Sequence, residues 1–382
     1  MREYVLVILV AAATTYLLCS LARELAVRVG AVAQVRDRDV HAIPIPYFGG
    51  VAMMTGLAVG VLLARNLPFL GGEGTERMFD DAGWVLLGGA VVCLVGVIDD
   101  VFELDAVTKL AGEVVAAGIV VVGGVQFYWL PIPGASGATP FVLEGSQAAL
   151  FTLVVIVATV NAVNFVDGLD GLAAGVVGIG ACAFFGYAYI IVAANNLERT
   201  SPAALLTAAL IGACMGLLPH NFYPARMFMG DSGALLIGFV LACAAITFTG
   251  QYDVTTLNQG VGGASASVIP ALLPLVLPIA VLLVPFLDMG MAVIRRTRAG
   301  RSPFAPDKQH LHHRLLEIGH SHRRAVLLMY MWASLVAMGA VLVSLFTGWQ
   351  SLLGVALLIV VALVLTFGLP GGRSLSRERS PL

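Results

Sequence analysis

Eleven apolar stretches, each about as long as a bilayer is thick, constrain most strongly what this chain folds into. Each runs for roughly 17–25 residues with few charges, the length that an α-helix needs to cross a hydrocarbon core. The stretches are 4–22, 48–65, 82–98, 110–127, 147–163, 171–194, 203–219, 232–249, 267–287, 325–346 and 350–369. The chain is therefore predicted to be an all-α integral membrane protein with about eleven transmembrane helices.

Composition agrees with this class of protein. Hydrophobic residues make up 59% of the chain and charged residues 12%, and mean hydropathy is +0.93. A net charge of -2 gives no reason to expect a nucleic-acid partner. The five cysteines fall singly within apolar runs, which predicts neither disulfides nor a zinc site. The first stretch lacks a small-residue cleavage site after it and is expected to be a retained helix rather than a signal peptide.

The distribution of lysine and arginine predicts the orientation. If the N-terminus is outside, 17 of the 21 basic residues fall on the cytoplasmic side, where such residues are enriched. Eleven spans then place the C-terminus in the cytoplasm. Residues 1–370 are expected to form one polytopic membrane domain with cytoplasmic catalytic loops, and residues 371–382 a short basic cytoplasmic tail.

Acidic residues gather on this same side, where apolar stretches meet short loops. They are Asp99, Asp100, Asp167, Asp170 and Asp231. Carboxylates beside lipid are costly unless a cation compensates them, and clustered oxygen ligands favour a hard divalent ion such as Mg²⁺ and hence phosphate chemistry. The alternatives are solvated loop acids, or caps of the following helices at Asp170 and Asp231. An ion-coupled transporter is a further alternative, but such proteins usually show internal repeats and polar groups at mid-bilayer.

A dense histidine cluster lies in the longest polar loop, in the sequence APDKQHLHHRLLEIGH. His310, His312 and His313 stand there beside Lys308 and Arg314. Since no cysteine is near, the cluster is predicted to bind an anion such as a diphosphate. A transition-metal site remains the alternative, because imidazole also suits zinc or nickel.

Several of these motifs, taken in order, resemble one family. VIDD, NAVNFVDGLDGLA, NFYPARMFMGDSG and PDKQHLHHRLL are similar to motifs of the polyprenyl-phosphate N-acetylhexosamine-1-phosphate transferases, the MraY/WecA family. The HLHH loop and the eleventh stretch look closer to the WecA/TagO branch. The segment RDRDVHAIPIPYFGG also resembles the family, with Tyr47 where arginine is common and Leu311 where isoleucine is usual.

The resemblance implies a reaction. A UDP-N-acetylhexosamine, expected to be UDP-GlcNAc, would give its sugar 1-phosphate to a polyprenyl phosphate (undecaprenyl or decaprenyl), with UMP as the second product. This is the first lipid-linked step of cell-envelope polysaccharide synthesis. It implies Mg²⁺, with Mn²⁺ as a substitute, at the cytoplasmic face of a bacterial plasma membrane. The alternative within the family is an MraY-type transferase that uses UDP-MurNAc-pentapeptide. The sequence leaves homodimer formation open.

The resemblance also implies roles for individual residues. The expected catalytic residues are Asp99, Asp100 and Asp231, with Asp231 as chief Mg²⁺ ligand, Asp99 beside it, and Asp100 at the acceptor phosphate. A covalent aspartyl-phosphate route is the less favoured mechanism. Asn164, Asp167 and Asp170 would line the nucleotide pocket, with Phe228 stacking on uracil. The expected phosphate ligands are Lys109, His310, His312, His313 and Arg314, and His41 would border the same cleft.

Overall fold

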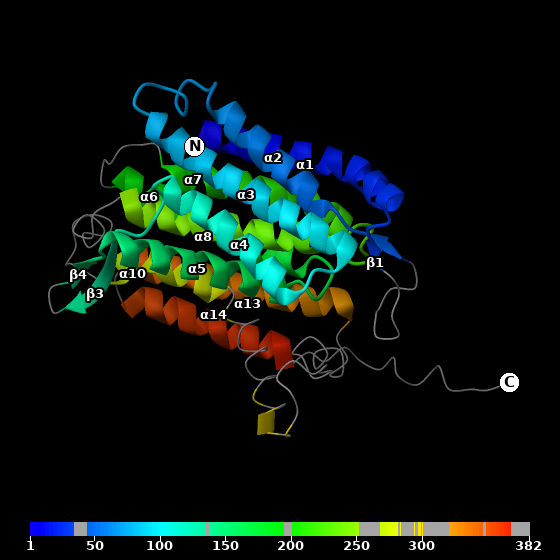
Figure 1. The fold of residues 1–382 in the computed structure, drawn as a ribbon. Coiled ribbons are helices and arrows are strands. Elements are labelled where there is room, and N and C mark those ends of the chain that lie inside the picture. The colour runs from blue at the N-terminus through cyan, green and yellow to red at the C-terminus, as the bar shows by residue number, and fades with distance from the viewer. Residues whose placement is uncertain are drawn as a thin grey trace.

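Eleven helices run side by side in one bundle among the residues that the computed structural model describes (Figure 1). The structure describes residues 1–33, 44–134, 137–194, 201–251, 268–281, 321–346 and 349–367, and residues 283, 294, 297, 298 and 300. The helices are α1 (Arg2–Val29), α2 (Gly49–Ala64), α3 (Glu76–Phe102), α4 (Ala106–Val122), α5 (Gly145–Val166), α6 (Leu172–Ala194), α7 (Pro202–Asn221), α8 (Gly230–Gln251), α10 (Val268–Val281), α13 (His322–Leu345) and α14 (Trp349–Phe367). Each predicted span overlaps one of them.

Eight of these helices are long and apolar enough to cross a membrane: α1, α3, α5, α6, α7, α8, α13 and α14. The other three have fewer described residues, with 16 in α2, 17 in α4 and 14 in α10. The all-α membrane class predicted from the sequence is therefore confirmed, and the chain is a multi-pass membrane protein. The predicted number of eleven spans stays a prediction, because the residues on either side of α10 lie outside the described part of the chain.

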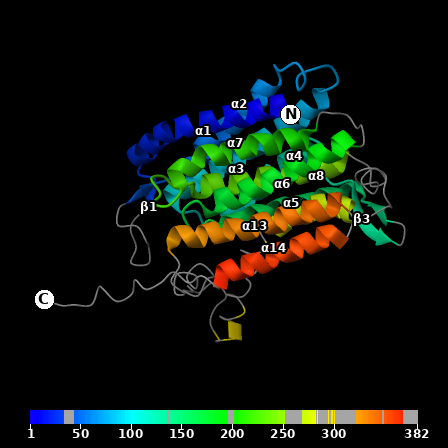
Figure 2. The same ribbon diagram turned by 180° about the vertical axis from the view of Figure 1, so that it is seen from behind.

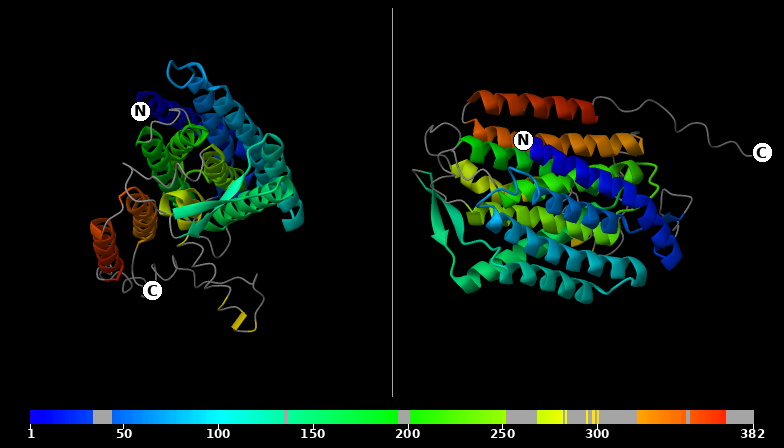
Figure 3. Two further views of the ribbon diagram at one scale, coloured as in Figure 1. Left: turned by 90° about the vertical axis from the view of Figure 1, so that its left-hand side faces the viewer. Right: turned by 90° about the horizontal axis from the view of Figure 1, so that it is seen from above.

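Helix α8 forms the core of the bundle. It is almost wholly buried and packs against α3, α5, α7 and α2. Viewed along the helices, it lies in the middle of the bundle, whereas α14 lies at the margin (Figure 3). From behind, α13 is seen beside α6, with α14 outside it (Figure 2). Because most of the α14 surface is apolar and exposed, that helix is suited to contact lipid.

Small residues allow α1 and α7 to pack with their backbones in contact. A Cβ atom on Gly212 would lie 2.4 Å from the carbonyl oxygen of Ile8, and one on Gly216 would lie 2.4 Å from that of Ala12. Two glycines spaced four residues apart are a common device of close helix packing in membranes, where burial of apolar surface drives association weakly. The contact fixes α1 against the centre of the bundle.

Two short antiparallel strand pairs connect helices. The pair β3 (Trp129–Gly134) and β4 (Gly137–Val142) forms a hairpin between α4 and α5, in a segment that the sequence reads as a Gly/Pro-rich loop. The pair β1 (Val32–Ala33) and β2 (Ile45–Pro46) lies between α1 and α2. Proline usually argues against strands because it lacks an N–H donor, which is why the sequence did not predict the hairpin.

Candidate active site

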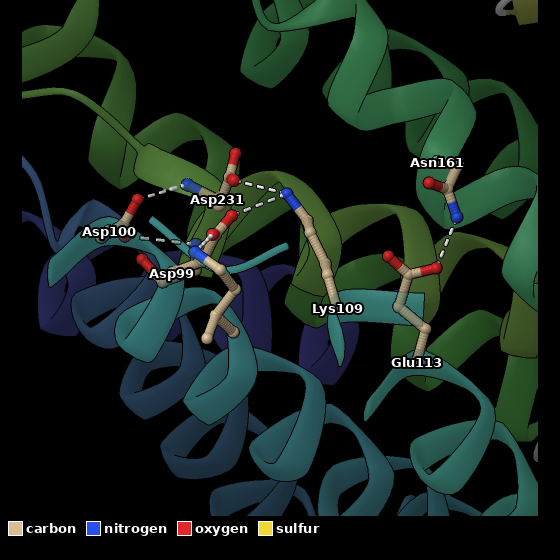
Figure 4. Close-up of polar contacts among 8 residues, drawn as sticks. Asp99, Asp100, Lys109, Glu113, Asn161 and Asp231 are labelled. Carbon is tan, nitrogen blue, oxygen red and sulfur yellow. Dashed lines mark hydrogen bonds and ion pairs between the residues drawn. The ribbon is translucent and has the colours of Figure 1, made fainter. Parts of the chain in front are cut away.

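Polar side chains from four helices meet where α3 ends and α8 begins. Asp99 lies in the last turn of α3, and Lys109 in the first turn of α4. Asp231 is the second residue of α8, and its carboxylate turns toward Lys109 (Figure 4). Local sequence makes the tight turn from α3 to α4. Glu103 ends α3 in the left-handed conformation, and the Asp105 carboxylate caps α4.

The Lys109 ammonium lies at the centre of this cluster. It donates to Asp99 Oδ2 at 2.9 Å and to a carboxylate oxygen of Asp231. With its amide oriented to suit both neighbours, Asn164 of α5 accepts from Lys109 Nζ at 2.8 Å and donates to Asp231 Oδ1 at 2.9 Å. The Lys109 and Asp99 side chains are only 15% and 11% exposed, so water screens this pair poorly. Four residues predicted from the sequence thus lie together.

Asp100 has a contact that the sequence did not suggest. Its carboxylate accepts from the backbone N–H of Asp231 at 2.8 Å and of Ser232 at 3.3 Å. These are among the amides at the start of α8 that lack a partner within the helix, so Asp100 caps α8 from α3. Gly230 makes the contact possible: its φ is +72°, and a Cβ there would lie 2.4 Å from Asp100 Oδ2. The structure thus places Asp100 behind Asp231, and its predicted role at the acceptor phosphate stays a prediction.

Asp167 adds negative charge to the cluster. It is half-buried at the end of α5. Burial, and then the charges of Asp231 and Asp100, raise the pKa of the Asp167 carboxyl to about 8. The positive charge of Lys109 therefore balances only part of the negative charge of these carboxylates. A divalent cation would relieve this surplus of negative charge.

Asp170, by contrast, joins two loops. Its buried carboxylate accepts from the backbone N–H of Ala225 at 3.0 Å. Asn221 supports the same junction, because it accepts from Gly171 N at 3.0 Å and donates to Met227 O at 3.1 Å. These bonds hold the loop after α5 against the loop before α8.

Phe228 lies in the loop before α8, which is fastened to the start of α2. Its backbone N–H donates to Pro46 O at 2.9 Å, and its carbonyl oxygen accepts from Gly49 N at 3.2 Å. The ring centroids of Phe228 and Tyr47 are 6.0 Å apart, an aromatic contact. The segment in which Tyr47 replaces the usual arginine therefore borders the same loop as Phe228.

Five predicted site residues lie outside the described residues. They are His41, His310, His312, His313 and Arg314.

A buried acid near the cluster was missed. Glu113 of α4 is 1% exposed and accepts a hydrogen bond from Asn161 of α5 (Figure 4). The sequence did carry a signal, since Glu113 is a single acid inside an apolar span, and such residues are functional candidates by default.

The donor set fits Mg²⁺ bound together with a substrate. Within the described part of the chain, no group of three or more His, Cys, Asp or Glu side chains is arranged to hold a metal by itself. Mg²⁺ usually binds through one or two carboxylates and completes its shell with water and substrate phosphates. Asp99 and Asp231, which converge on one ammonium group, supply such a pair.

Comparison with known proteins gives concordant matches. The sequence profile of glycosyl transferase family 4 matches residues 83–249. A decaprenyl-phosphate N-acetylglucosaminephosphotransferase of Mycolicibacterium smegmatis is 46% identical over 369 residues, 96% of this chain and 88% of the relative. The protein of the same name from Mycobacterium tuberculosis is 46% identical over 343 residues, 89% of this chain and 82% of the relative. A probable undecaprenyl-phosphate N-acetylglucosaminyl 1-phosphate transferase of Bacillus subtilis is 30% identical over 364 residues, 94% of this chain and 90% of the relative.

Proposed function

The chain belongs to glycosyl transferase family 4, and from this premise we propose that it transfers N-acetylglucosamine 1-phosphate from UDP-GlcNAc to a polyprenyl phosphate. An oxygen of the acceptor phosphate bonds to the phosphorus that carries the sugar, the P–O bond to UMP breaks, and UMP leaves. The product is polyprenyl-diphospho-GlcNAc. The names of the relatives, at up to 46% identity over nearly the whole chain, support this donor over the UDP-MurNAc-pentapeptide of the alternative.

The cluster of Lys109, Asp99 and Asp231 is the observation that carries this proposal. It lies where α3 ends and α8 begins, a position where a lipid phosphate and a water-soluble nucleotide could meet. Transfer between two phosphates needs little covalent help from the protein, because the main obstacle is repulsion between negative groups. A site that combines an ammonium with a cation-binding pair of carboxylates would lower that repulsion.

Each residue of the cluster has a role in this proposal. Asp231 and Asp99 would hold Mg²⁺, which when bound would neutralise charge on the diphosphate. Lys109 would bind a phosphate oxygen, and Asn164, which donates to Asp231 Oδ1, would orient that carboxylate. Asp100 orients Asp231 through the start of α8.

The nucleotide would lie along the loops that meet beside this cluster. Phe228 offers its ring to the uracil base, and Asp170 holds the loop between Asn221 and Met227 in place. Five further residues are proposed, from the family resemblance, to bind phosphates or to border the cleft. They are His41, His310, His312, His313 and Arg314.

The site is proposed to face the cytoplasm of a bacterial cell. The lysine and arginine distribution supports this orientation. It also places the site on the side where nucleotide sugars are made.

A direct assay tests the proposed function. The purified protein is incubated with polyprenyl phosphate, Mg²⁺ and one of three donors: UDP-GlcNAc, UDP-glucose or UDP-MurNAc-pentapeptide. UMP release is expected with UDP-GlcNAc only, and it should need both the lipid and the metal, so EDTA should stop it and Mn²⁺ should restore it. UMP release without polyprenyl phosphate, or faster release from UDP-MurNAc-pentapeptide than from UDP-GlcNAc, would overturn the proposal.

A further inference from the structure

Lys109 occupies the position that a divalent cation would take. Its ammonium lies between carboxylate oxygens of Asp99 and Asp231, the pair assigned to Mg²⁺ under the proposed function, on which this inference rests. Two cations cannot share so small a space without strong repulsion. Lys109 must therefore leave at least one of these carboxylates when the metal binds, and a charged side chain of low exposure needs another anionic partner.

Glu113 is placed to be that partner. It follows Lys109 by four residues on α4, so the two side chains lie on one face of the helix. The residue is 1% exposed, and its Oε2 accepts from Asn161 Nδ2. Its Oε1 is buried and has no hydrogen-bond partner among the described residues. Leaving such an atom unsatisfied is costly, which points to a donor that arrives in another state of the site.

The geometry agrees with a move of Lys109 toward Glu113. In Figure 4 the Glu113 oxygen that does not bond to Asn161 is on the side of Lys109. The two charges already interact electrostatically, although no ion pair joins these two described residues. Asn161 also donates to Val157 O at 2.9 Å, which fixes its amide and hence the Glu113 carboxylate.

The geometry points to Glu113 as a positioning residue that receives the Lys109 ammonium when a divalent cation occupies Asp99 and Asp231. Lys109 fills the carboxylate pair in the absence of metal and swings to Glu113 Oε1 when metal binds. Glu113 therefore favours metal binding although it is not a metal ligand. Its effect should act only through Lys109.

Mn²⁺ binding to the purified protein, followed by electron paramagnetic resonance without any substrate, tests this directly. Lys109→Met removes the competing cation and should tighten Mn²⁺ binding by about tenfold. Glu113→Gln removes the alternative partner and should weaken binding by about fivefold. In the double variant, Glu113→Gln should have no further effect, and the affinity should equal that of Lys109→Met.

Controls keep the outcomes separate. Glu73→Gln removes an exposed carboxylate from the loop between α2 and α3 and should leave Mn²⁺ affinity unchanged. Glu113→Asp keeps the charge but retracts it by one methylene, so an intermediate affinity is expected even if the glutamine variant folds poorly. A loss of affinity on Glu113→Gln that is equally large with and without Lys109 would overturn the inference alone. If the wild type binds no Mn²⁺, the metal centre of the proposed function falls, and the inference with it.

Discussion

At the scale of single residues, Asp231 is the carboxylate on which most contacts converge. Lys109 and Asn164 both bond to it, and its own backbone N–H bonds to Asp100. Asp231→Asn keeps the shape and removes the charge that a hard cation needs, so UMP release should fall by about a hundredfold or more. The variant should remain monodisperse in detergent, because it keeps the size of the side chain at the partly exposed start of α8. Turnover at the wild-type rate would remove Asp231 from the metal centre.

Asp100 separates two hypotheses about the same side chain. As a cap of α8, it holds the backbone of Asp231 and Ser232, so Asp100→Asn should weaken Mn²⁺ binding as well as turnover. In the role predicted from the sequence, at the acceptor phosphate as its base, it should affect turnover alone. Mn²⁺ affinity and UMP release, measured on one preparation of the variant, decide between them. An unchanged Mn²⁺ affinity with lost turnover would favour the base.

Asp167 predicts how stability depends on pH. Burial and the acidic neighbours raise the pKa of its carboxyl to about 8 in the folded protein, whereas an unperturbed Asp carboxyl titrates near pH 3.9. Between these values the folded state holds a proton that the unfolded state has lost, so stability should fall as pH rises through this window and level off above it. Without metal, Asp167→Asn should flatten this slope and raise the Tm at pH 8 by about 2–4 °C over the wild type. Parallel Tm–pH curves for the two proteins would contradict the assignment.

At the scale of helices, the packing of α1 on α7 makes a prediction about stability. Gly216→Ala places a Cβ 2.4 Å from Ala12 O, so α1 must move away, and the Tm in detergent should fall by several degrees. Gly118→Ala in α4 is the matched control, because a Cβ there meets nothing within 4 Å. The control should keep or slightly raise the Tm, since alanine favours a helix over glycine. Equal Tm values for both variants would argue against close packing at Gly216.

Hydropathy predicted where each helix lies, because each needs a run of apolar residues. It did not predict where α4 begins, since that helix starts at Ala106 and ends at Val122, whereas its apolar run covers 110–127. Nor did it predict the hairpin of β3 and β4, because these strands contain prolines, which are not typical of strands. These differences follow from packing and turn geometry, which a hydropathy window does not contain.

The site was predictable to the extent that its residues stand at helix ends. Asp99, Lys109, Asn164 and Asp231 each lie near such an end and do come together. The cap that Asp100 places on α8 joins residues 131 positions apart, so no local pattern shows it. Glu113 lay within an apolar run and was overlooked because its partner, Asn161, belongs to another helix.

At the scale of the whole molecule, α3 is long and apolar enough to link the two faces of a membrane. It begins beside the loop that contains Glu73 and ends at Asp99 and Asp100, and a helix of its 27 residues is about 40 Å long, enough to cross a bilayer. The loops at its two ends should therefore lie on opposite sides, with the catalytic cluster on the cytoplasmic one. Both Glu73 and Ala106, the first residue of α4, are exposed and available for labelling.

The orientation is tested by placing single cysteines at these two positions. The background should lack all five native cysteines, since Cys182 is exposed. In intact cells, a membrane-impermeant maleimide should label Glu73→Cys, while Ala106→Cys should react only after the membrane is opened. The reverse pattern would put Lys109 and its carboxylates outside, away from cytoplasmic UDP-GlcNAc, and would overturn the proposed orientation. Labelling of both positions in intact cells would mean that α3 does not cross the membrane, and the site would then lack the lipid boundary that its proposed acceptor requires.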